Sequence, residues 1–378
     1  MPVPSAPATV TLSVAVMTHP ARAAQAEKLA AELQDCSVRV IQDPAPERGP
    51  ATMRTARAAW AAVGQNATHH LVLQDDVMPA PGLLDAVRRA AGARPEHALA
   101  FFAEWGSRSA TPIRIAALCG SAWAEVVDFY IPAQALVLPA AVARAADGYL
   151  ATQDEDTPDD IALHGYLHGA GVPIWVSVPN LVEHADTPSL IGNQVLGLRR
   201  SACHLPDVGS ARDLADPQGD AVTGLLAIPY FSWWDKAALC FTREGPTAAQ
   251  WQQRPGRDVQ DAYGIDDTVV DAAFEHQCGR FPAQRWSELT ALVDKAKLRD
   301  LWTVAFSTGL LAGVHRPGLD EAATTSIPAQ AALGSLAPGA LRTVVSPERD
   351  GWVYSLLAPF VEAATRHGIA QARTVVAP

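Results

Sequence analysis

The sequence predicts an α/β fold, in which helices cover a parallel sheet, over about the first 200 of its 378 residues. Two observations support this. Short apolar runs with strand composition alternate with segments that have the apolar periodicity of helices. The early runs also end at turn-forming residues, as strands do before the chain turns back. A third observation marks the end of this region. After about Ser201 the alternation stops, and a polar stretch with Gly and Pro leads into mainly helical patterns.

The predicted elements of the first half follow one another in strict alternation. The ligand site of such a sheet is expected at the carboxyl ends of its strands. In chain order we expect a strand at 10–17, a helix after Pro20 with the stripe Ala26, Leu29, Ala30 and Leu33, a strand at 37–43, a helix at 51–63, a strand at 69–74, a helix with Leu83, Leu84 and Val87 on its inner face, strands at 97–103 and 129–139, a helix at 157–171 and a strand at 174–179.

A loop is expected between the strands at 97–103 and 129–139, from about Glu104 to Ser121. Residues 205–220, LPDVGSARDLADPQGD, are polar and carry Gly and Pro, which is typical of a linker or a long surface loop. Beyond them the pattern is mainly helical, around 286–314 and 352–367. The sequence therefore predicts two domains, a sheet domain at 1–200 and a mainly helical accessory domain at 201–378.

Composition excludes several classes of protein. The formal charge is −11, from 29 basic and 40 acidic residues, and no Lys/Arg-rich block is present, so nucleic acid is not an expected partner. Five scattered cysteines fit neither a disulfide framework nor a zinc-ribbon spacing. The apolar run at 10–17 is too short to span a bilayer, and no basic segment precedes it. We expect a cytoplasmic protein without a membrane span, and its oligomeric state stays open.

The stretch HHLVLQDDVMP, residues 69–79, ends a buried strand in two adjacent carboxylates, Asp75 and Asp76. An aspartate at a strand end is commonly a turn former or a helix cap. Two adjacent carboxylates repel each other, however, and a cation relieves that repulsion. Oxygen-rich sites of this kind suit Mg²⁺ or Mn²⁺.

Residues 10–195 resemble the nucleotide-sugar-dependent glycosyltransferases of the GT-A type, in particular family 2 and the family 25 branch with its LEDDV signature. Four segments carry the resemblance: VAVMTHPAR after the first strand, VIQD after the second, VLQDDVMPAPGLLDAV after the third, and PNLVEHADTPSLIGN near residue 190. The resemblance implies a Rossmann-like sheet domain that binds a nucleoside diphosphate sugar.

The resemblance also assigns roles to single residues. It implies that Mn²⁺ or Mg²⁺ is bound by Asp76 and His184, and that the nucleotide is held by Thr18, Arg22, Asp43, Gln74 and Asp75. Gln74 stands where relatives usually have an acid, so the motif carries one charge fewer. Each of these residues also has an ordinary alternative, as a turn residue, a solvated helix residue or a hydrogen-bonded histidine.

An inverting transfer needs a general base for the acceptor hydroxyl. Asp160 or Asp159 falls where the family places that carboxylate, although Thr157 to Asp160 also has the form of a helix capping box. Trp105 and Trp123 are candidates for a sugar platform or for the core, and the pair Trp233-Trp234 is a candidate for an acceptor pocket.

The sequence thus predicts a metal-dependent glycosyltransferase that moves a sugar, from a UDP-sugar as the expected donor, to a hydroxyl acceptor. The second domain would cover the cleft, recognise the acceptor or mediate self-association. One alternative is a sugar-phosphate nucleotidyltransferase, but VAVMTHPAR lacks the Gly-rich loop of that class. The other is a catalytically inactive binding module with the same sheet, which Gln74 favours.

Overall fold

A computed structural model describes residues 9–33, 36–49, 51–188, 190, 192–206, 214–216, 220–248 and 250–375. The chain forms two compact units, and each is discontinuous in sequence. The first comprises Met1–Ala103, Val126–Asn193 and Leu205–Asp220, and the second comprises Glu104–Glu125, Gln194–His204 and Ala221–Pro378. Most of the predicted linker at 205–220 lies outside the described residues.

The first unit contains a mixed sheet, and its strands match the predicted ones. In spatial order they are β8 (Ile174–Ser177), β5 (Ala98–Ala100), β7 (Ala135–Pro139), β3 (His69–Gln74), β1 (Leu12–Thr18) and β2 (Val38–Gln42). β1 pairs in parallel with both β2 and β3, whereas β7 is antiparallel to β3 and β5. The predicted parallel sheet is therefore correct for β1 to β3, and the antiparallel β7 makes the whole sheet mixed.

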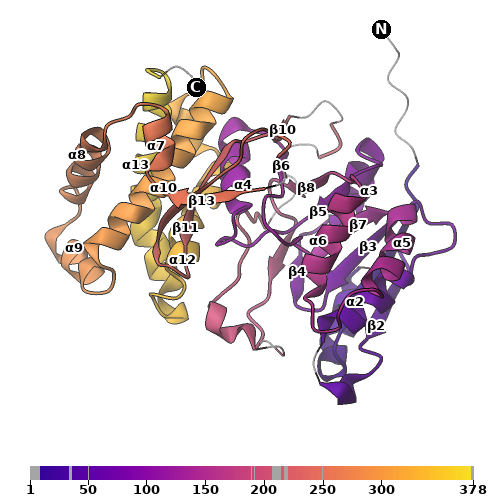
Figure 1. The fold of residues 1–378 in the computed structure, drawn as a ribbon. Coiled ribbons are helices and arrows are strands. Elements are labelled where there is room, and N and C mark those ends of the chain that lie inside the picture. Colours follow the sequence, from indigo (N-terminus) through magenta and orange to yellow (C-terminus); the bar gives the residue numbers. More distant parts are fainter. Residues whose placement is uncertain are drawn as a thin grey trace, which may run out of the picture. The chain divides into compact units, whose positions relative to one another are not determined.

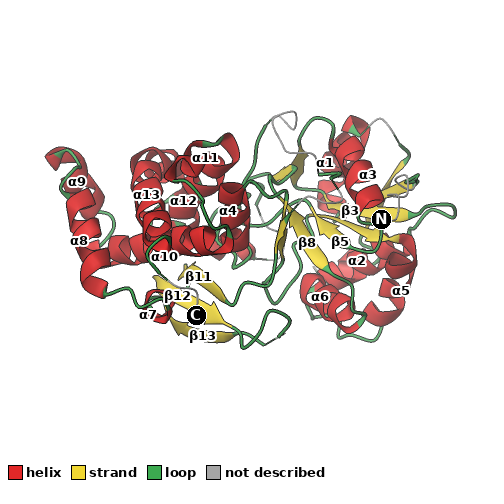
Figure 2. Ribbon diagram, turned by 90° about the horizontal axis from the view of Figure 1, so that it is seen from above, coloured by secondary structure: helices red, strands yellow, loops and turns green. Residues whose placement is uncertain are grey.

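Helices cover both faces of this sheet. Figure 2 shows α1 and α3 on one face and α2, α5 and α6 on the other. Their bounds are α1 (Ala23–Glu32), α2 (Thr52–Ala61), α3 (Leu83–Ala93), α5 (Ala140–Leu150) and α6 (Asp159–Gly169). The predicted inner face of α3, with Leu83, Leu84 and Val87, is buried.

The strand order reverses at β1. The chain moves from β1 through α1 to β2 on one side, and then through α2 back across β1 to β3 on the other side. Crossovers between parallel strands are right-handed, so the two crossover helices must lie on opposite faces, as they do in Figure 2. In open α/β sheets, ligands bind at the carboxyl ends of the strands at such a reversal, which here is the edge formed by the last residues of β1 and β3.

The second unit is mainly helical but also contains an antiparallel sheet. The order of its strands is β11 (Ala227–Ser232), β12 (Ala237–Thr242) and β13 (Gln252–Pro255). Apart from this sheet, the unit contains β6 (Trp123–Glu125) and β10 (Ala221–Val222), which pair in parallel with each other. The helices are α4 (Ala110–Cys119), α7 (Asp258–Ala262), α8 (Asp267–Cys278), α9 (Ala283–Thr290), α10 (Lys295–His315), α11 (Ile327–Gly334), α12 (Leu336–Leu341) and α13 (Asp350–Ala372). The predicted helical segments at 286–314 and 352–367 are confirmed, whereas the three-stranded sheet was not predicted.

The long helices α10 and α13 pack side by side, as Figure 1 shows. Glycine makes the close approach possible. A Cβ atom at Gly309 would lie 2.1 Å from the carbonyl oxygen of Thr365, and one at Gly368 would lie 2.0 Å from that of Phe306. Any larger residue at either position would push the two helices apart.

The loop predicted from Glu104 to Ser121 is wrong, because this segment contains α4. All ten residues of α4 are buried. A helix that is buried on every side has no polar face, so it lacks the periodicity by which sequence patterns reveal helices. Among the helices that the structure describes, none is long and apolar enough to cross a membrane.

Candidate functional site

The two adjacent carboxylates lie at the carboxyl end of β3, beside the end of β1. The parallel register pairs Met17 with Gln74, so the next residues, Thr18 and Asp75, are neighbours. The Thr18 hydroxyl donates a hydrogen bond to Oδ2 of Asp75. Asp75 and Asp76 are each only 6% exposed, which makes their mutual repulsion costly unless a positive group lies nearby.

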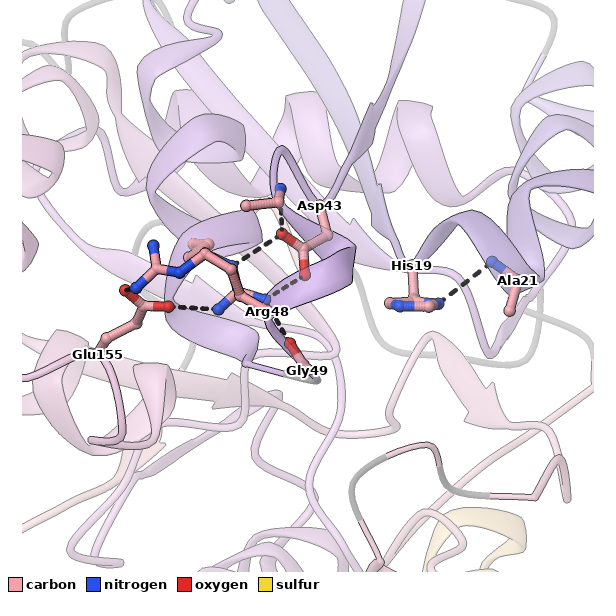
Figure 3. Close-up of polar contacts among 8 residues, drawn as sticks. His19, Ala21, Asp43, Arg48, Gly49 and Glu155 are labelled. Carbon is pink, nitrogen blue, oxygen red and sulfur yellow. Dashed lines mark hydrogen bonds and ion pairs between the residues drawn. The ribbon is translucent and has the colours of Figure 1, made fainter.

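Arg22 supplies that positive group. Its Nη1 atom lies 3.2 Å from Oδ1 of Asp75 and 3.2 Å from Oδ2 of Asp76, so one guanidinium bridges both carboxylates. Its Nη2 atom donates to the carbonyl oxygen of Pro188. The short 3₁₀ helix Pro20–Arg22 positions Arg22, and the ring of His19 accepts a hydrogen bond from the Ala21 amide at its start (Figure 3).

His184 completes this cluster. The strand β4 (Val77–Pro79) pairs antiparallel with β9 (Val182–His184), which places His184 opposite Val77. The Nε2 atom of His184 lies 3.4 Å from Oδ2 of Asp76, and the amide of Ala185 donates to the Asp76 carbonyl at 2.7 Å. The sequence-predicted residues Thr18, Arg22, Asp75, Asp76 and His184 are therefore brought together in space.

The pKa of Asp75 reflects the balance of charge in this cluster. Burial raises the pKa of Asp75 above its ordinary value, and the neighbouring charge of Asp76 raises it further. The hydrogen bond from Thr18 and the charge of Arg22 oppose that rise. Gln74 is the last residue of β3 and is half-buried. Its backbone amide donates a hydrogen bond to the backbone carbonyl of Gln134 at 3.0 Å.

Asp43 lies at the end of β2, where its amide donates to the Thr18 carbonyl at 3.0 Å. Its carboxylate accepts from Nε of Arg54 at 3.0 Å, from Nη2 of Arg54 at 2.8 Å and from the Ala45 amide at 3.0 Å. The Arg54 hydrogen bond is the main reason why the pKa of Asp43 lies below its ordinary value. The carboxylate that was predicted to contact a nucleobase is thus bound by Arg54 and by the Ala45 amide.

Figure 3 shows the rest of this second cluster, in which Glu155 joins two arginines. Glu155 pairs with Arg54 and also, at 2.8 Å, with Arg48. Sequence reasoning missed Arg54 and Glu155. Arg54 lies in the first turn of α2, directly after Asp43 and its loop, which is a usable signal, but nothing in the sequence connects Glu155 with a residue 101 positions away.

The two candidate bases begin α6 and differ in environment. Asp159 is buried, and Oδ2 of its carboxyl group has no hydrogen-bond partner among the residues that the structure describes. Burial raises the pKa of Asp159, and a hydrogen bond with Thr52 partly offsets this. Asp160 is half-buried, and its Oδ1 accepts from the Ile161 amide at 2.8 Å.

The capping box considered for Thr157 to Asp160 is absent. The N-cap residue of α6 is Pro158, whose side chain makes no hydrogen bond to the helix. Thr157 lies outside the helix, and its amide donates to the carbonyl of Asp154 at 3.0 Å. Asp159 and Asp160 are therefore not used as capping partners of Thr157.

Topology places both candidate bases at the same edge of the sheet as the cluster around Asp76. The Gln74 amide bonds to Gln134, just before β7, and the Ile131 amide bonds to the Asp160 carbonyl at 3.2 Å. The loop before β7 therefore runs from the end of β3 to the start of α6. Asp159 and Asp160 share this edge with Asp75 and Asp76.

The fit of a metal ion rests on two side chains. In the described part of the chain, no group of three or more His, Cys, Asp and Glu side chains is placed to hold a metal. Asp76 and His184, with 3.4 Å between their polar atoms, have a spacing that two ligands of one ion can adopt. Mg²⁺-type sites commonly use one or two protein ligands, with water and substrate phosphates as the others. The pair fits such an ion, provided that Arg22 gives up its contact with Asp76.

The two tryptophans considered as sugar platforms are both buried. Trp105 and Trp123 are at most 6% exposed, so their role is in the core. Trp234, by contrast, is 75% exposed at the turn between β11 and β12.

No known protein family matches the chain, and no curated protein matches it.

Proposed function

We propose that the first unit binds a nucleoside diphosphate sugar, with a UDP-sugar as the expected donor, and transfers the sugar to a hydroxyl acceptor in the manner of GT-A glycosyltransferases. The observation that carries this proposal is the cluster of Thr18, Arg22, Asp75, Asp76 and His184 at the point where the strand order reverses. Open α/β sheets bind nucleotides at such a point.

The charges of this cluster suit a diphosphate leaving group. Negative charge develops on the diphosphate as the bond to the sugar breaks, and fixed positive groups stabilise it. The guanidinium of Arg22 can donate its hydrogen bonds to phosphate oxygens in place of the carboxylates. The Thr18 hydroxyl holds Asp75 in place meanwhile.

Asp76 and His184 would hold the metal ion. A bound Mn²⁺ or Mg²⁺ neutralises the charge of the diphosphate. Imidazole is a better ligand for Mn²⁺ than for Mg²⁺, so His184 favours manganese. Arg22 would have to release Asp76, because a divalent ion and a guanidinium repel each other at this distance.

Asp159 or Asp160 would remove the proton from the acceptor hydroxyl. A carboxylate whose pKa is raised by burial is a stronger base than an exposed one, and Asp159 has this property. Asp160 is more accessible. The proposal therefore assigns the base to this pair without dividing the role between its members.

A second candidate is a binding module without turnover. It is favoured by the bridge that Arg22 forms between Asp75 and Asp76, because this bridge reduces the repulsion of the two carboxylates without any metal. Gln74, which stands where an acid would strengthen metal binding, points the same way.

A screen of nucleotide sugars for hydrolysis, followed by mass spectrometry, tests the proposal. Many transferases hydrolyse their donor slowly when no acceptor is present, so one active nucleotide sugar would identify both the class and the donor. We expect Asp76→Asn to abolish this hydrolysis while its melting temperature stays close to that of the wild type. Asp85→Asn, at an exposed residue that pairs with Arg88, is the matched control and should keep full activity. Full hydrolysis by Asp76→Asn would show that the assignment of Asp76 is wrong.

A further inference from the structure

The second unit contains a small cavity next to the start of α4. Polar and aromatic residues line it together, among them Trp105, Ser107, Thr111, Arg114 and Tyr230. The free space is small, with room for about one water-sized group. The cavity belongs wholly to the second unit, so it is separate from the cluster around Asp76.

Arg114 lies in this cavity as a buried cation without an acidic partner. Arg114 belongs to α4, and the residue is only 2% exposed. Nε donates to the Ala332 carbonyl at 3.1 Å, and Nη2 donates to the Trp105 carbonyl at 2.8 Å and to the Ser335 hydroxyl at 3.1 Å. These acceptors are neutral. Within the described chain, no carboxylate pairs with Arg114 and its Nη1 atom makes no hydrogen bond.

The cation stays charged at neutral pH. Burial lowers the pKa of Arg114 to about 9, which still leaves the guanidinium protonated at pH 7. The nearby thiol of Cys203 brings no negative charge, because burial raises the pKa of Cys203 to about 12. A buried charge without a counter-ion is strongly unfavourable.

A neighbouring arginine shows the contrast. Arg342 is equally buried, but it forms an ion pair with Glu104 and lies over the ring of Trp233 at 4.5 Å. Two buried guanidinium groups therefore contact the segment 104–107, and the described residues provide a carboxylate for Arg342 alone. One positive charge is left in this region.

Ser107 provides an independent sign of a ligand. The residue is 6% exposed and lines the cavity, yet its hydroxyl has no hydrogen-bond partner in the part of the chain that is described. A buried hydroxyl without a partner costs free energy unless a ligand or water satisfies it. The cavity also lies at the N-terminal end of α4, where the helix dipole favours negative charge.

We propose that this cavity binds one small monovalent anion, chloride, through Nη1 of Arg114 and Oγ of Ser107. The anion neutralises the remaining guanidinium and accepts the hydrogen bond of the serine hydroxyl. A halide is among the smallest common anions, so it suits this small free space better than larger anions do. Because the site joins α4 to α11 and α12, through Arg114 and the lining residue Leu336, chloride stabilises the second unit.

Crystals of the full chain soaked in sodium bromide test the site directly. We expect an anomalous bromine peak in the cavity, within hydrogen-bond distance of Arg114 Nη1 and Ser107 Oγ. In solution, the melting temperature should rise and saturate with sodium chloride, and it should rise less with sodium gluconate at the same ionic strength. The proposal is overturned if the cavity contains no bromine peak, or if chloride and gluconate give the same melting curves.

Ser107→Ala is the informative variant, because it removes one hydrogen bond and leaves the core packed. We expect the chloride midpoint of the melting shift to increase roughly tenfold. Arg114→Met should abolish the chloride effect, and Arg254→Met, at an exposed arginine of the same unit, should leave it unchanged. If Arg114→Met does not fold, Ser107→Ala still decides the matter, since an unchanged chloride midpoint in that variant contradicts the assignment of its hydroxyl.

Discussion

Replacing Arg22 by glutamine should increase the affinity of the protein for Mn²⁺ in the absence of nucleotide. Arg22 Nη1 lies 3.2 Å from one oxygen of Asp75 and one of Asp76, so it competes with any ion at these oxygens. A divalent ion about 4 Å from a guanidinium is repelled by about 2 kcal/mol in bulk water and by about 8 kcal/mol at an effective dielectric constant of 20. The Arg22 side chain is 15% exposed, so the smaller value is a lower bound. It corresponds to an affinity at least about 30-fold higher in the variant.

Titration calorimetry or the electron paramagnetic resonance signal of free Mn²⁺ measures this change. Arg48→Gln is the matched control, because Arg48 is also a cation beside a carboxylate of the first unit, but it pairs with Glu155. Its Mn²⁺ affinity should equal that of the wild type. A second sign is expected in the melting temperature of Arg22→Gln, which should rise on addition of Mn²⁺ because the ion replaces the lost positive charge. Equal Mn²⁺ affinities of Arg22→Gln and the wild type would refute the competition between guanidinium and metal.

Three further predictions concern other residues of the first unit. Asp43→Asn should lower the free energy of unfolding by about 1.5–3 kcal/mol, because it removes the negative charge from the hydrogen bonds with Arg54. Urea denaturation measures this loss. If the variant keeps its stability and loses affinity for UDP, Asp43 contacts the nucleobase instead. Asp159→Asn should stabilise the protein at neutral pH. The raised pKa means that the wild type loses stability as the pH rises from the ordinary aspartate value to the folded-state value, by at most about 1.4 kcal/mol per pH unit, and the variant should lack this slope in denaturation curves. His184→Ala should weaken UDP binding in Mn²⁺ more than in Mg²⁺, and equal losses in calorimetry would argue against His184 as a ligand.

The sheet of the first unit was predictable because its strands are mainly apolar runs with clear ends. The alternation of strands and helices up to residue 74 implies that β1, β2 and β3 run parallel in one sheet, and it places Thr18, Asp43 and Asp75 at one edge. The gathering of site residues at that edge therefore follows from the sequence. The reversal to antiparallel at β7 does not, because a buried run reads the same in either direction.

The partners of the site residues could not be predicted. The contact of Arg22 with Asp75 joins residues 53 positions apart and depends on the orientation of a short 3₁₀ helix. The sequence suggested that a metal relieves the repulsion of the two carboxylates, whereas the structure shows a guanidinium between them. Sequence patterns report burial and local propensity, but ion pairs between distant segments depend on tertiary packing.

The second unit was harder to predict for a related reason. Segment 104–125 belongs to this unit, although the strands of the first unit flank it in sequence. Contacts such as that between Arg114 and Ser335, 221 residues apart, bring it there. No local pattern carries this information, and the buried surroundings of Arg114 and Ser107 emerge only with the fold.

The most direct test of the central claim is calorimetric titration of the full chain with UDP, with and without Mn²⁺. If Asp76, His184 and Arg22 form a diphosphate site, UDP should bind in the presence of Mn²⁺, and chelation of the metal should weaken the binding. Absence of UDP binding under both conditions would contradict the account.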